Sequence, residues 1–147
     1  MSSDDTRAAV ADIFDAFAKG DFARLALRYD EDIDWVFYAP VAVFPFTGAR
    51  RGRAAVFQAY ADMFRDYRLE RQEREAIIVE GDRAAALLDV TLVQRSTGRT
   101  VRSRVASFYR FRDGRVVEYR GFVDSFDASE QALGRWFDVG PPPGAAT

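Results

Sequence analysis

The residue best placed to do chemistry is Asp89, because it interrupts the apolar stretch at residues 84–93. Burying an unpaired carboxylate costs several kcal/mol or forces it to take up a proton. This aspartate therefore needs either a chemical task or a structural partner. As a functional residue it would be a general acid or base on the wall of a cavity. As a structural residue it would be hydrogen-bonded to Thr91, to a neighbouring Tyr or Arg, or to a backbone amide.

Aromatic rings and hydroxyls form a second group of candidates. An apolar site with a few polar groups is typical of a pocket for a small hydrophobic molecule. Most such rings belong to the ordinary core of a domain, but the hydroxyl of a tyrosine or serine can also orient a ligand. The candidate ligand-binding residues are Trp35, Phe37, Tyr38, Phe57, Tyr60, Ser107, Tyr109 and Tyr119.

The 147 residues include no histidine and no cysteine, which excludes histidine-based triads, thiolate nucleophiles and Cys or His zinc sites. The acidic run at residues 30–34 lacks the spacing and the glycine of an EF-hand and is more typical of a solvated turn. We therefore expect no metal and no cofactor. A net charge of -2 argues against a nucleic-acid partner. With no long apolar run and no signal-peptide pattern, we expect no membrane segment and a cytoplasmic location.

Helical periodicity is confined to the first half of the chain. Val10, Ile13, Phe14 and Phe17 recur at helical spacing, and two further helices are expected at about residues 22–29 and 53–64, with a short strand at 33–38 between them. From residue 68 the pattern changes to four strand-like runs separated by turns at 81–82, 96–98 and 113–114, which predicts an antiparallel meander. Residues 129–137 are expected to be helical or irregular.

This order of elements predicts a single α+β domain over residues 1–139, with helices packed on one face of a curved antiparallel sheet. Residues 140–147 are rich in Pro and Gly and are expected to form a flexible tail.

The span from Arg7 to Asp127 resembles the SnoaL-like branch of the nuclear transport factor 2-like (NTF2-like) superfamily, which also contains ketosteroid isomerase and limonene epoxide hydrolase. The resemblance implies a cone, also described as a cystatin-like α+β roll, in which three N-terminal helices pack in a curved sheet. It further implies a pocket inside the cone and a homodimer, but no single activity. The segments that carry it are Ala18-Lys19-Gly20-Asp21, Asp30-Glu31-Asp32-Ile33-Asp34-Trp35, Pro45-Phe46-Thr47-Gly48 with Arg51-Gly52, Val79-Glu80-Gly81-Asp82-Arg83, Phe111-Arg112-Asp113-Gly114-Arg115-Val116 and Phe122-Val123-Asp124.

The resemblance to ketosteroid isomerase implies that Ser107 replaces the oxyanion-hole aspartate of that family. The odd-numbered residues 101–111 would then face inward. The general base of that family maps near Phe37, and its oxyanion tyrosine maps near Phe14 or Phe17. All three catalytic groups are therefore missing, and ketosteroid isomerisation is not expected.

The resemblance to limonene epoxide hydrolase places an aspartate of that enzyme at Asp89, which implies that Asp89, Leu87 and Thr91 face inward. The arginine and the second aspartate of its relay fall on Leu87 and Gly121, so the relay is incomplete. We expect Asp89 to lie beside Ser107 and one or more of Tyr38, Tyr109 and Tyr119.

Two functions follow from these expectations. The first is an isomerase, cyclase or hydrolase that acts on a small hydrophobic molecule with Asp89 as acid or base. The alternative is a non-catalytic ligand-binding or interaction module of the same fold.

The opposite sheet face carries alternating arginines together with Phe108 and Phe122, which predicts pairing with a second copy.

Overall fold

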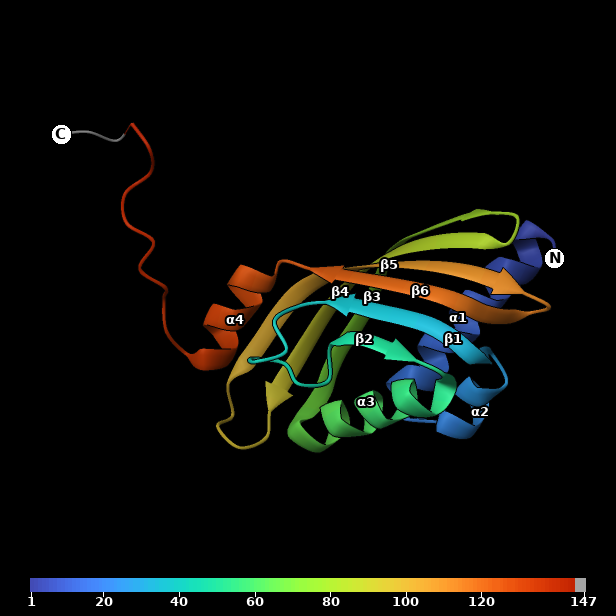
Figure 1. Ribbon diagram of the computed structural model, residues 1–147, viewed down its shortest axis with the longest axis horizontal. Coiled ribbons are helices and arrows are strands. Elements are labelled where there is room, and N and C mark those ends of the chain that lie inside the picture. The colour runs from blue at the N-terminus through green and yellow to red at the C-terminus, as the bar shows by residue number, and fades with distance from the viewer. Residues whose placement is uncertain (145–147) are drawn as a thin grey trace.

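The structure is a computed structural model, and it describes residues 1–144 (Figure 1). The last three residues of the predicted 140–147 tail lie outside the described part. The elements follow the expected order, with an additional short strand after the first one, and the segment expected to be helical or irregular after the last strand begins as a helix. They are α1 (Ser3–Ala18), α2 (Phe22–Ala26), β1 (Tyr29–Tyr38), β2 (Gly48–Arg51), α3 (Arg53–Asp66), β3 (Tyr67–Glu80), β4 (Arg83–Gln94), β5 (Thr100–Arg112), β6 (Arg115–Val123) and α4 (Ser125–Leu133).

The helix ends follow from local capping chemistry. Ser2 accepts a hydrogen bond from the backbone N–H of Asp5, whose carboxylate accepts one from the N–H of Ser2, so α1 begins with a capping box. Asp21 caps the start of α2 by accepting from the N–H of Arg24. Between the two helices, Gly20 adopts a positive φ of 63°, a conformation that costs glycine little.

The six strands form one curved sheet in the order β2-β1-β6-β5-β4-β3. The four strands of the predicted meander pair antiparallel, as expected. The expectation of a wholly antiparallel sheet is wrong at one pair, because β1 runs parallel to β6. After β2 the chain passes along α3 to the far edge of the sheet, so the meander returns to β1 with its last strand in the same direction (Figure 1).

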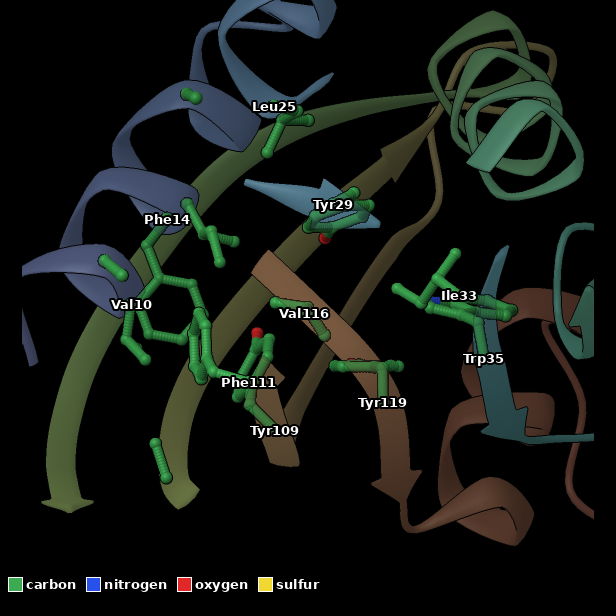
Figure 2. Close-up of a cluster of buried hydrophobic side chains, with 14 of the residues drawn as sticks. Val10, Phe14, Leu25, Tyr29, Ile33, Trp35, Tyr109, Phe111, Val116 and Tyr119 are labelled. Atoms are coloured by element: carbon green, nitrogen blue, oxygen red, sulfur yellow. The ribbon is translucent and has the colours of Figure 1, made fainter. Parts of the chain in front are cut away.

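Helices α1, α2 and α3 lie against the concave side of the sheet (Figure 1). Figure 2 shows Val10 and Phe14 of α1 directed toward Tyr109 and Phe111 of β5. The large buried cluster is made by α1, α2, α3 and the concave side chains of the strands. A smaller cluster packs α4 and the loop after β1 against the start of β5, and includes Phe44 and Val101.

The inward and outward side chains of β4 are exchanged relative to our expectation. Its residues pair directly with β5 as Ala86 with Ser107, Leu88 with Val105 and Asp89 with Arg104. Directly paired residues of antiparallel strands share a face of the sheet. Since Ser107 points inward, as predicted, Leu88 also points inward and Asp89 lies on the outer face. Even-numbered residues of β4 pair with odd-numbered residues of β5. A register shifted by one residue would move every side chain of β4 to the other face of the sheet.

Candidate functional site

A cavity of about 140 Å³ lies between the concave sheet face and the helices. A single water molecule needs roughly 10–15 Å³ on the same scale, so this space exceeds an ordinary packing defect. The lining is almost wholly apolar, and none of its side chains carries a formal charge. Its polar members are Tyr29, Trp35, Thr47, Tyr60, Gln72, Ser103, Ser107, Tyr109 and Tyr119.

Six of the predicted ligand-binding residues line this cavity, namely Trp35, Phe37, Tyr60, Ser107, Tyr109 and Tyr119. The other two do not. Tyr38 is half exposed on the outer side of the sheet, where its ring stacks on Phe122 at 4.8 Å between centroids. Phe57 packs in the core between Phe22 and Tyr29, with its ring centroid 5.6 Å from each. Tyr38 therefore belongs to the outer surface of the sheet and Phe57 to the core.

Three hydroxyl-bearing side chains converge on the inner face of β5 and β6. The Ser107 and Tyr119 hydroxyl oxygens are 2.9 Å apart and share a hydrogen bond. Tyr109 is paired with Tyr119 across the strands, and their ring centroids lie 5.1 Å apart. We call Ser107, Tyr109 and Tyr119 the hydroxyl triad.

The triad depends on Gly121, which pairs with Ser107 on the neighbouring strand. A Cβ atom at this position would lie 2.6 Å from the Tyr119 hydroxyl and 2.4 Å from the Phe37 ring. Real Cβ atoms do not approach so closely, so only glycine lets the Tyr119 ring reach across to Ser107. The sequence comparison had treated Gly121 only as the loss of an aspartate.

A second hydroxyl network lies beside the first. The Tyr29 and Tyr60 hydroxyls share a hydrogen bond of 2.9 Å, and the indole Nε1 of Trp35 donates to the Tyr60 hydroxyl at 3.2 Å. Trp35 also stacks on Tyr119, with ring centroids 5.6 Å apart and planes 16° from parallel. Trp35 thus links the two hydroxyl groups into one aromatic wall, parts of which are visible in Figure 2.

The tyrosines of this wall stay protonated at neutral pH. Burial raises the pKa of Tyr60 to about 12, although its hydrogen bonds with Tyr29 and Trp35 act in the opposite direction. Burial also raises the pKa values of Tyr29, Tyr109 and Tyr119 well above that of an exposed tyrosine. These groups are neutral hydrogen-bond donors and acceptors, and the lining offers no carboxylate that could act as a general base.

Asp89 belongs to an ion-pair network on the outer face, so the expectation that it points into the cone is wrong. Arg102 donates to both of its carboxylate oxygens, with Nε–Oδ1 at 3.2 Å and Nη2–Oδ2 at 2.8 Å. Arg71 approaches to 3.7 Å, and the Asp89 side chain is only 6% exposed beneath these arginines. The hydrogen bonds from Arg102 lower the pKa of Asp89. Of the two roles that the sequence left open for Asp89, the structure therefore agrees with the structural one, in which an arginine is its partner.

Sequence reasoning did not single out Gln72 and Ser103 as site residues, although both line the cavity. Ser103 lies on the inner face predicted for its strand, so strand alternation alone could have found it. Gln72 lies between two irregularities in the pairing of β3 with β4, which hide the alternation. Nothing in the sequence around Gln72 marks it as an inward residue.

Comparison with known proteins places this architecture in a family. The model of the SnoaL-like domain matches residues 10–119. The chain therefore belongs to the SnoaL-like domain family of the NTF2-like superfamily. No curated protein matches the sequence.

Solved structures of similar proteins agree with this assignment. A proposed isomerase from Rhodopseudomonas palustris is 34% identical, with a TM-score of 0.81 over 86% of this chain and 97% of its own. An epoxide hydrolase from M. tuberculosis, described as similar to limonene epoxide hydrolase, is 18% identical, with a TM-score of 0.71 over 90% and 92%. TerC, co-crystallised with polyporic acid, is 18% identical, with a TM-score of 0.74 over 88% and 98%.

The relay of limonene epoxide hydrolase has no counterpart on the inner wall. The inward residues of β4 are apolar and include Ala86, Leu88 and Val90, whereas Asp89 lies on the other side of the sheet.

Among the described residues, no helix is both long enough and apolar enough to cross a membrane.

Proposed function

We propose that this protein binds a small, uncharged hydrophobic molecule inside the cone. The observation that carries the proposal is a cavity of about 140 Å³ whose lining is apolar and free of formal charge. A charged ligand would lose its hydration there without gaining a counter-ion, which is costly in an apolar environment. The cavity therefore favours neutral ligands over their ionised analogues.

The hydroxyl triad would orient the ligand. Within the triad, one member of the Ser107–Tyr119 pair donates to the other, so the accepting hydroxyl keeps its own proton free. The Tyr109 side chain also lines the cavity, and its hydroxyl lies within reach of Ser107. At least one O–H donor is thus available to a carbonyl or hydroxyl oxygen of the ligand.

Calorimetric titration with 2-naphthol and with 2-naphthoate tests this function. We expect 2-naphthol to bind and 2-naphthoate, which has the same rings and a negative charge, to bind at least about tenfold more weakly. Because the lining tyrosines keep their protons, binding of the naphthol should not change between about pH 6 and pH 8. Equal binding of the anion would contradict the proposal.

Matched variants on one strand locate the binding. Val90 lines the cavity, whereas Val93 does not, so Val90→Phe should abolish naphthol binding and Val93→Phe should leave it unchanged. Circular dichroism shows whether each variant is folded. Binding that survives in folded Val90→Phe would place the ligand elsewhere.

A second candidate function is isomerisation or cyclisation of the bound molecule, favoured by the 34% identity to the proposed isomerase. Tyr109 and Ser107 could stabilise a developing oxyanion by hydrogen bonding. The lining has no carboxylate to take the proton, so we expect 2-tetralone to bind without faster exchange of its acidic hydrogens in deuterium oxide. Exchange that is accelerated by the wild type, and not by Tyr109→Phe, would favour catalysis.

We further propose that two copies pair through the outer face of β1, β5 and β6. Phe108 and Phe122 are exposed there, with ring centroids 5.9 Å apart, and Tyr38 stacks on Phe122. Arg110 and Glu118 form an ion pair of 3.6 Å on the same face, so this face carries both signs of charge. A stable pair should bury at least about 1,000 Å². Light scattering should give a dimer for the wild type and a monomer for Phe122→Glu, and a wild-type monomer would contradict the pairing.

A further inference from the structure

The inner wall carries a second group of polar atoms, which lies four residues along β5 from Ser107 of the hydroxyl triad. Val90 of β4 pairs with Gln72 of β3 on one side and with Ser103 of β5 on the other. The three residues therefore form a row across the sheet, and all three line the cavity. Ser103 is two residues from Val101, which packs under α4 in the smaller apolar cluster, so the row lies on the α4 side of the triad, and the cavity continues past it to Val101 and Ala128.

The hydrogen bonds of this row leave two polar atoms available. The Gln72 Nε2 donates to the backbone carbonyl oxygen of Phe14 at 3.0 Å, and because that partner can only accept, the remaining atom is the carbonyl Oε1. The hydroxyl of Ser103 has no hydrogen bond within the described residues, and no buried side-chain oxygen there lacks a partner, so it is accessible. The row thus offers an acceptor and a hydroxyl on either side of Val90.

From this arrangement we infer that the ligand carries two oxygen groups, one at each end of a flat apolar body. The inference rests on the proposed binding function. The triad presents an O–H donor and takes a carbonyl or hydroxyl oxygen. The row of Gln72 and Ser103, on the α4 side of the triad, presents an acceptor and a hydroxyl and takes a hydroxyl group.

Strand geometry sets the length of the ligand. Ser103 and Ser107 are four residues apart on the same face of β5, which is about 13 Å along an extended strand. A hydrogen bond of about 2.8 Å at each end leaves about 7–8 Å between the two ligand oxygens. That separation matches two fused six-membered rings with oxygens at their far corners, as in 2,6-dihydroxynaphthalene.

The test compares 2,6-dihydroxynaphthalene with 2-naphthol, which lacks the second hydroxyl. We expect the wild type to bind the diol about fivefold more tightly, the effect of one added hydrogen bond in a buried site. Ser103→Ala and Gln72→Leu should each remove that preference, so that each variant binds the two compounds with equal affinity. Thr91→Val removes a hydroxyl from the outer face of the same sheet and is the matched control, so it should preserve the preference.

The outcomes separate the two proposals. If neither compound binds, the proposed binding function fails. If both bind the wild type with equal affinity, or if the preference for the diol survives in Ser103→Ala and in Gln72→Leu, the second polar group is overturned while the binding function stands. The Ser103→Ala result alone decides the question if Gln72→Leu disturbs the contact with α1.

Discussion

The two faces of strands β4 and β5 differ in the charged side chains that they carry. The inner face presents Leu88, Val90 and Val105 with a few hydroxyls and no charged group to the cavity. The outer face of the same strands carries Asp89 and Arg104 in direct register, within a network of ion pairs. One backbone thus separates an uncharged cavity wall from a charged surface, and the alternation of side chains along each strand decides which residues belong to which.

The comparison predicts that added volume costs more at a closely packed position of the inner face than on the outer face. Gly121→Val should cost about 3 kcal/mol of unfolding free energy, because its side chain would overlap the Phe37 ring and the Tyr119 hydroxyl. Ala106→Val, which adds volume on the outer face of β5, should change stability little. Urea unfolding of both variants provides the measurement, and equal losses would remove the distinction between the faces.

Loss of a hydroxyl from the inner wall should have the next largest effect. Tyr119→Phe removes the 2.9 Å hydrogen bond of the Ser107 hydroxyl, a residue only 2% exposed, and should cost about 1–2 kcal/mol. Ser107→Ala should cost a similar amount, and the double variant should cost less than the sum because the two residues share one interaction. Strictly additive losses in urea unfolding would show that the pair does not act as a unit.

Much of the fold could be predicted from the sequence because its signals are local. Turns containing Gly81, Gly98 and Gly114 mark the hairpins of the meander, and each of these glycines has a positive φ. The inner face of β5 also follows from alternation once Ser107 is placed. The site proved harder, because the role of Asp89 depended on how β4 and β5 pair across the turn that contains Gly98. The pairing of even-numbered residues of β4 with odd-numbered residues of β5 could not be predicted from either strand alone.

Gly121 shows a second reason why the site could not be fully predicted. Its importance comes from the rings of Phe37 and Tyr119, which reach it from β1 and from its own strand. Contacts of this kind are set by the packing of the whole cone and leave no local pattern. The sequence therefore supplied most of the aromatic candidates, and the three-dimensional arrangement selected those that share a wall.

On the outer face, Asp89→Asn tests a charge that has no part in the cavity. The folded-state pKa of Asp89 is lowered, so its ionised form adds stability above the pKa of about 3.9 expected in the unfolded chain, and this stability is lost as the pH falls through the lower folded value. The variant should therefore unfold at a lower temperature than the wild type at pH 7, and the difference should shrink toward pH 3. Affinity for 2-naphthol should be the same in both proteins. A folded Asp89→Asn that no longer binds 2-naphthol would return Asp89 to the candidate site.

The smallest effect is expected at Arg104, which pairs with Glu75 at 2.9 Å but has a side chain that is 63% exposed. Exposed ion pairs contribute less than about 1 kcal/mol, because water screens the attraction and two long side chains lose rotamer freedom. Arg104→Gln should therefore lower stability only slightly, and the difference should vanish in about 1 M salt, where the Debye length is about 3 Å. Arg102 offers the matched comparison, since it donates two hydrogen bonds to the covered Asp89 carboxylate. Arg102→Gln should lower stability more than Arg104→Gln, and part of its loss should persist in high salt. If the two variants behaved alike at both salt concentrations, coverage of Asp89 by its arginines would not matter, and the outer face would be a uniform layer of solvated charges.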